Sequence, residues 1–348
     1  MWNRFRLCGA DNRGRLDRRS SSTSRGNIMK SLALFALSTI ATAAMAVQPT
    51  SPGTVSIGAT GSSTQTSSIS NTTVSNLASA VPGTAAHQNL ASNHGGNVII
   101  NGSSTQEVNA SGPAANAIKN TAAGSGAYAL QDLSSNAGNV SIGTGAVSKQ
   151  LTNVLDGTTL DNHATGDASN AFQNLSSNNG NVNVNAGTSD QKTTLNASVV
   201  KNDAQANGTT AIQNLSSNYG GTGAGVLLNA NSTQTTTFNP GTDALNTTSG
   251  INSFAVQNFA SNYLDVTVNA ASIQTVTATG NTDFSNTAFG LNSKAAQNIS
   301  SNFDNVTIGG PSTQTAFFSG ALVTNEANGT NSRAVQNISS NYAPSPAF

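Results

Sequence analysis

The chain has 348 residues and a formal net charge of zero, and only 8% of its residues are charged and 5% aromatic. Ordinary globular proteins carry roughly 25% charged residues, so the composition is far from that of a typical globular domain. Disordered chains usually combine high net charge with few β-branched residues, whereas here the charge is zero and valine and isoleucine recur regularly. The composition therefore indicates an Asn/Gln-rich, β-prone chain.

The N-terminus divides into two predicted segments. Residues 1–28 contain seven arginines and differ from all that follows. We interpret them as a non-structural leader or a misassigned start, with translation beginning at Met29, and a targeting arm is the alternative. Residues 29–46 begin with a methionine and a lysine, continue with an apolar run and end in small residues, which is typical of a secretory signal peptide. We expect cleavage after Ala46.

Cleavage after Ala46 changes both the cysteine content and the charge. It removes Cys8, the only cysteine, so we expect neither disulfides nor thiolate metal sites. Eight basic and two acidic residues precede Val47, which leaves six basic and twelve acidic residues. A chain poor in basic residues has no electrostatic footprint for nucleic acid or anionic lipid. No cofactor and no integral membrane segment are expected.

Residues 47–342 are predicted to form one repeat domain, followed by a short tail at 343–348. The first glutamine of each repeat is Gln88, Gln131, Gln173, Gln213, Gln257, Gln297 or Gln336. Their successive sequence numbers differ by 43, 42, 40, 44, 40 and 39. A period near 40 that varies slightly indicates one supersecondary unit stacked in an array. The predicted fold is all-β: a β-solenoid, or cross-β-like stack, of about seven strand-turn-strand repeats.

Each repeat contains two arms in which the residues alternate as in a β-strand. The first arm has the pattern AxQNxSSN, as at residues 295–302, and the second continues from valine to glutamine, as at residues 266–274. A short Asn/Gly/Asp-rich turn joins the two arms. A longer segment of variable length, rich in Gly, Asn and Thr, then precedes the next first arm. We expect these longer segments to be loops, with room for a third, weaker strand.

The recurring amide side chains are the candidate functional residues. A buried glutamine costs a few kcal/mol if it is unpaired. In repeats that stack in register at about 4.8 Å, however, each amide can donate to one neighbour and accept from the other. Besides the first glutamines, the predicted stacking ladder contains Gln106, Gln234, Gln274, Gln314, Asn174, Asn214, Asn258, Asn298 and Asn337.

These repeats resemble those of bacterial functional amyloid subunits. They are similar to curli subunits in their strand-turn-strand units with glutamine and asparagine on both arms. They are similar to Fap-type fibre subunits in their longer Asn/Gln/Ala-rich repeats and in segments such as GNVNVNAG at 180–187. The resemblance implies an exported bacterial subunit that polymerises outside the cell or at its surface. Its partners would be further copies of itself, a nucleator subunit and a dedicated outer-membrane secretion channel.

Residues of the kind that perform catalysis do not recur with the repeat. His87, His94 and His163 have no equivalents in other copies, and Asp132 replaces an asparagine of the ladder. The sequence contains no nucleotide-binding glycine motif and no nucleophile elbow. We therefore expect no catalytic site, no metal site and no enzyme.

Two functional hypotheses follow from the repeat. In the first, the protein is a secreted structural subunit that assembles into extracellular amyloid-like fibres for biofilm matrix or surface attachment, because open strand edges at both ends could template further copies. In the second, it is a monomeric β-solenoid adhesin whose loops bind glycans or host protein. The second hypothesis requires polar caps at both ends of the solenoid.

Overall fold

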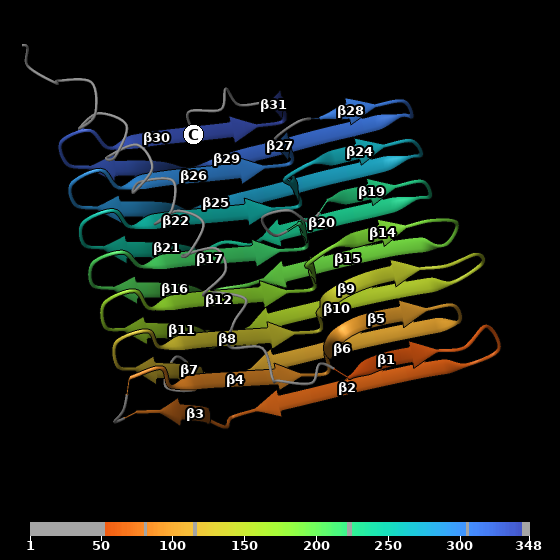
Figure 1. Ribbon diagram of the computed structural model, residues 1–348, viewed down its shortest axis with the longest axis horizontal. Helices are drawn as coiled ribbons and strands as arrows, with labels where there is room; N and C mark the ends of the chain where they lie inside the picture. The colour runs from red at the N-terminus through yellow and green to blue at the C-terminus, as the bar shows by residue number, and fades with distance from the viewer. Residues whose placement is uncertain (1–52, 80–81, 114–116, 221–224, 304–305, 343–348) are drawn as a thin grey trace, which may run out of the picture. The chain divides into compact units, whose positions relative to one another are not determined.

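A computed structural model describes residues 53–79, 82–113, 117–220, 225–303 and 306–342 (Figure 1). The expected leader, signal peptide and C-terminal tail lie outside the described residues. The described residues contain 31 strands and no helix. Strands pair in parallel with their equivalents one repeat further along the chain, as β12 (Asn170–Leu175) does with β17 (Thr210–Leu215). The fold is therefore the expected all-β stack of repeats, a β-solenoid.

One turn of the solenoid passes through three sheets, which we name A, B and C. In the third full turn, β12 lies in sheet C, and the chain then enters sheet A through β13 (Asn178–Asn179) and β14 (Val182–Val184). It reverses and returns through sheet B as β15 (Thr188–Leu195) and β16 (Val199–Gln205). Sheets C and A therefore form one wall, and sheet B forms the opposite wall (Figure 1).

The remaining strands occupy equivalent places in the other turns. Sheet C also contains β4 (Ala85–Leu90), β8 (Tyr128–Leu133), β22 (Phe254–Phe259), β26 (Lys294–Ile299) and β30 (Arg333–Ile338). Sheet A also contains β1 (Thr54–Ile57), β5 (Asn93–Ile100), β9 (Asn136–Ile142), β18 (Asn218–Tyr219), β19 (Val226–Leu228), β23 (Asn262–Tyr263), β24 (Val266–Val268), β27 (Asn302–Phe303), β28 (Thr307–Ile308) and β31 (Asn341–Tyr342). Sheet B also contains β2 (Ser62–Ser70), β3 (Val74–Ala78), β6 (Ser103–Ser111), β7 (Ala117–Ala123), β10 (Val147–Leu155), β11 (Thr159–Thr165), β20 (Ser232–Phe238), β21 (Asp243–Ser249), β25 (Ser272–Phe289) and β29 (Ser312–Asn328).

A left-handed residue bends the chain between sheets C and A in every turn. After β12 this residue is Ser176, whose φ is 49°. A non-glycine residue with positive φ is uncommon, yet the same conformation recurs at Ala91, Ser134, Ser216, Ala260, Ser300 and Ser339. The Ser176 hydroxyl donates to the carbonyl of Lys192 in sheet B at 2.8 Å. Ser176 therefore forms the bend and also ties it to the opposite wall.

The core between the walls is layered by residue type. Small alanines, such as Ala171 of sheet C and Ala164 of sheet B, form one buried cluster. Larger residues, such as Leu175 of sheet C and Val154 of sheet B, form another. Valines and isoleucines of sheet A form a third. Because each layer continues from turn to turn, the core is a set of columns running along the solenoid axis.

Three details of the expected repeat were wrong. The first arm is not one strand, because β26 ends at Ile299 in sheet C and β27 lies in sheet A. The second arm is not one strand, because the chain turns after Val268 and places β24 in sheet A and the start of β25 in sheet B. The longer segments, expected as loops with room for a third, weaker strand, are mostly strand, since they complete β25 or form β11, β16 and β21. Parallel pairing with equivalent residues in neighbouring turns stabilises these weakly patterned segments, and such long-range pairing is hard to recognise within a single repeat.

Candidate functional site

The first glutamine of each repeat forms a continuous hydrogen-bonded column inside the solenoid. Each Nε2 donates to the Oε1 of the glutamine one turn earlier, at 2.6 to 2.9 Å over all six steps from Gln88 to Gln336. The five central glutamines are fully buried. Most also donate to sheet B, as Gln213 does to the carbonyl of Val200 at 3.2 Å. The amides in this column thus bind both the adjacent turn and the opposite wall.

A column of asparagines in sheet B faces the glutamines. Its members are Asn76, Asn120, Asn162, Asn202, Asn246, Asn286 and Asn325, and each step from Nδ2 to Oδ1 is 2.8 Å. Asn162 also donates to the carbonyls of Ala129 and Phe172 in sheet C, at 3.2 and 2.9 Å. Each of the two facing columns therefore donates hydrogen bonds to backbone carbonyls of the wall that carries the other column. These asparagines are not among the residues predicted from the sequence.

The same spacing in the sequence could have identified this asparagine column. The sequence numbers of Asn162, Asn202, Asn246 and Asn286 differ successively by 40, 44 and 40. The corresponding glutamines, from Gln173 to Gln297, have the same spacings. The regular spacing of these asparagines is hard to recognise in the sequence because the residues around them vary from repeat to repeat.

The asparagines that follow the first glutamines form a second column on sheet C. Asn214, Asn258, Asn298 and Asn337 each donate to the asparagine one turn earlier at 2.8 Å. Asn174 donates to the carboxyl group of Asp132 at 2.7 Å. A carboxylate accepts hydrogen bonds but cannot donate them. The aspartate therefore ends this column before it reaches Asn89 of the first full turn.

The glutamines of sheet B stack in register but do not bond to one another. Gln234, Gln274 and Gln314 are register partners, as are Gln65 and Gln106. Their amides instead donate across the core, as Gln234 does to Asn262 Oδ1 at 2.9 Å. The Oε1 atoms of Gln106, Gln150, Gln191, Gln234 and Gln274 are buried without a hydrogen-bond partner. The expected amide ladder is thus absent from this set of glutamines.

The asparagine that receives these bonds belongs to a fourth column at the bend. Its members are Asn93, Asn136, Asn178, Asn218, Asn262, Asn302 and Asn341, with each Nδ2 donating to the next Oδ1 at 2.9 to 3.0 Å. Each is the asparagine that ends an SSN triplet or, at Asn93 and Asn262, an ASN triplet. Aromatic side chains stack beside this column, since the rings of Tyr219, Tyr263 and Phe303 lie 5.1 and 5.0 Å apart in nearly parallel planes.

Ionisable groups are few, and two histidine–aspartate pairs join adjacent turns. His94 Nδ1 lies 3.2 Å from Asp132 Oδ2, and His163 Nδ1 lies 3.4 Å from Asp203 Oδ2. The hydrogen bond to Asp132 outweighs burial and raises the pKa of His94 above 6.5. Burial favours a raised pKa for Asp203, but hydrogen bonds from His163 and Gln205 and the charge of Lys201 lower it overall. No group of three potential metal ligands occurs in the described part of the chain.

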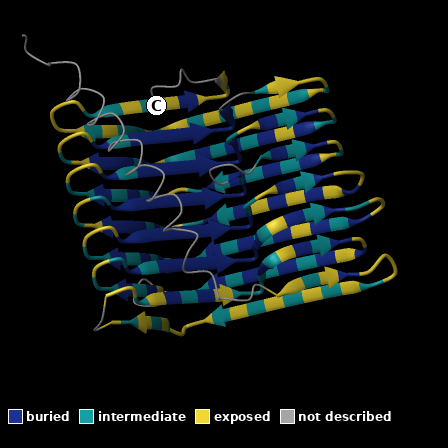
Figure 2. Cartoon of the chain, viewed as in Figure 1, coloured by how far each residue is buried: buried dark blue, intermediate teal, exposed yellow. Residues whose placement is uncertain are grey.

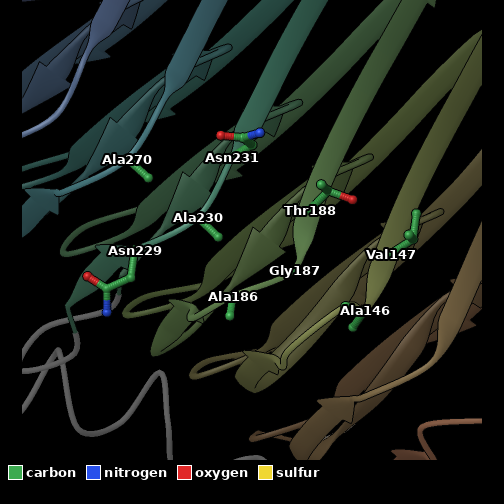
Figure 3. Close-up of a pocket in the computed structure, with 10 residues that line it drawn as sticks. Ala146, Val147, Ala186, Gly187, Thr188, Asn229, Ala230, Asn231 and Ala270 are labelled. Carbon is green, nitrogen blue, oxygen red and sulfur yellow. The ribbon is translucent and has the colours of Figure 1, made fainter.

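A shallow depression of about 390 Å³ lies at the turns between sheets A and B. Figure 3 shows small side chains such as Ala146, Ala186, Ala230 and Ala270 along it. Its polar side chains are Thr188, Asn229 and Asn231, and no ionisable side chain lines it. Among the described residues, the amide columns are therefore the most distinctive polar feature.

No family model, no curated protein and no solved structure matches the chain. No helix long and apolar enough to cross a membrane occurs among the residues that the structure describes.

Proposed function

We propose that the protein is a secreted structural subunit that assembles end to end into extracellular amyloid-like fibres, as biofilm matrix or for surface attachment. The observation that carries this proposal is the shape of the two ends. Among the described residues, the first turn contains β1, β2 and β3 but no strand of sheet C, and the last contains β30 and β31 but no strand of sheet B. Each partial turn supplies the strands that the other lacks.

The partial turns also leave core residues open to solvent. In β26, Ala295, Gln297 and Ile299 are fully buried, whereas their equivalents in β30 are exposed, with Ile338 at 40%. Figure 2 shows the same change from buried central turns to partly exposed end turns. Unpaired parallel edges with exposed apolar residues are templates for further strands. A head-to-tail interface between two different ends produces a filament when its rotation does not close into a ring.

The test is assembly of the purified full chain. After dilution from denaturant, we expect fibres that bind thioflavin and diffract at about 4.7 and 10 Å, the strand and sheet spacings. A chain that stays monomeric and soluble at micromolar concentration, with β circular dichroism, would refute the proposal and favour a surface adhesin.

A further inference from the structure

The amide columns have directions, and the directions differ between columns. In the glutamine column, each residue donates to its equivalent one turn earlier, so Gln336 Nε2 donates to Gln297 Oε1. In the facing asparagine column, each residue donates to its equivalent one turn later, as Asn76 Nδ2 does to Asn120 Oδ1. The column on sheet C that includes Asn337 follows the glutamine direction. The column at the bend follows the opposite direction.

The two ends of the solenoid consequently present different atoms. No described donor reaches Gln336 Oε1 at the C-terminal end or Asn76 Oδ1 at the N-terminal end. The donor that would continue the glutamine column belongs to an N-terminal end, and the donor that would continue the asparagine column belongs to a C-terminal end. Each end is therefore complementary to the other end and not to itself.

Resting on the fibre function proposed above, we propose that copies join with a single polarity and in one register. The C-terminal end of one copy seats on the N-terminal end of the next, so that β30 pairs with β4, β29 with β2 and β3, and β28 with β1. Gln88 of the second copy then donates to Gln336 of the first, and Asn325 of the first donates to Asn76 of the second. The glutamine column and the facing asparagine column both continue across the junction.

The apolar columns fit the same register. Continuing the sequence of register partners places Ala334 next to Ala86 and Ile338 next to Leu90. In sheet B it places Phe318 next to Ile69, and Val323 next to Val74. Two identical ends could meet only around a twofold axis. Their strands would then run antiparallel, and two Gln336 side chains that met there would both present an acceptor.

Thr66 and Thr315 offer a direct probe of this polarity. They are exposed on the outer face of sheet B and lie on one column of register partners, through Glu107, Leu151, Lys192, Thr235 and Thr275. Six steps of about 4.8 Å separate them by about 29 Å within one copy. A disulfide requires Cα atoms within about 7 Å, so one between these positions can form only across a junction.

The experiment uses the full chain with Cys8→Ser as background and adds Thr66→Cys or Thr315→Cys. We expect each single variant alone to stay uncrosslinked under mild oxidation, and the mixture to give the 66–315 disulfide as the main product by peptide mapping. As a register control, Thr313→Cys replaces Thr315→Cys. It shifts the thiol by two positions along the strand, so we expect little product with Thr66→Cys.

The possible results separate this inference from the proposed function. Fibres linked mainly as 66–66 or 315–315 homodimers would overturn the single polarity while leaving fibre assembly intact. Equal crosslinking through Thr313→Cys and Thr315→Cys would overturn the register. Background chain that forms no fibres would refute the proposed function itself, whereas loss of fibres only in the cysteine variants would place the substituted threonines at the junction, as proposed.

Discussion

The contrast between Gln213 and Gln234 tests whether the amide column stabilises the solenoid. Both side chains are fully buried, and leucine has a similar volume. Gln213 accepts a hydrogen bond from Gln257 and donates to Gln173, to Val200 and to Leu245. Gln213→Leu leaves the Gln173 oxygen buried without a donor and removes one acceptor from Gln257. An orphaned buried polar group costs about 1–3 kcal/mol, so we expect a loss of about 3 kcal/mol in the free energy of unfolding.

Gln234→Leu is the matched control. Gln234 donates to Asn262 Oδ1 and to the Ser261 carbonyl, and its own Oε1 is already unpaired. Asn262 Oδ1 keeps its bond from Asn218. We therefore expect a change within about 1 kcal/mol of zero. Urea unfolding of freshly refolded, unassembled chain, followed by circular dichroism, measures both values. Equal losses, or a larger loss for Gln234→Leu, would refute the view that the bonded column provides the stability.

Three other predictions concern the backbone and pH. Ala206 has a φ of 133° where equivalent turns have glycine, so Ala206→Gly should raise the free energy of unfolding by about 1 kcal/mol, strain relief outweighing added chain entropy; unchanged urea midpoints would contradict this. Gly250→Ala should lower it by roughly 3 kcal/mol, because φ is 127° and the new Cβ would lie 2.2 Å from the Ala206 carbonyl oxygen; an unaltered thermal midpoint would argue against the clash. Because the pKa of His94 is raised in the folded chain, protonation of His94 stabilises the fold. This contribution to the free energy of unfolding is complete below pH 6.5 and is lost as the pH rises through the folded pKa. Asp132→Asn should abolish that loss in a pH series of unfolding measurements, and a parallel pH dependence in both chains would show that the pair does not contribute.

The sequence was sufficient to predict the repeat because register is set by residues that recur in every copy. The sequence numbers of Gln257 and Gln297 differ by 40, and the same interval relates their backbone partners. It was not sufficient to predict the path within one turn. The segment from Val266 to Gln274 alternates like one strand, yet it turns between two sheets. Alternation reports only which side chains point inward, and that parity can persist across a turn.

The hydrogen-bond partners of the amide side chains also could not be predicted from the sequence. Gln234 and Gln257 look equivalent because both recur with the repeat and point inward. Their bonding differs: Gln234 donates to an asparagine of the column at the bend and to a backbone carbonyl, whereas Gln257 donates to its equivalent one turn earlier and to a backbone carbonyl of sheet B. Which acceptor lies across the core depends on how two walls meet, and no single repeat contains that information.

The columns prevent a strand from sliding along its own direction, but they do not determine which turn it pairs with along the solenoid axis. A slip of two positions along a strand would place Gln257 beside Ala295 or Ile299, which would orphan an amide in the core, so sliding within a sheet is costly. A shift by one whole turn would place Gln257 beside another glutamine in the same geometry, at little cost in core hydrogen bonds. The interactions that align turns within one chain therefore do not depend on the number of turns. The same interactions are available to align the last turn of one copy with the first turn of another, which is the translational symmetry that a fibre requires.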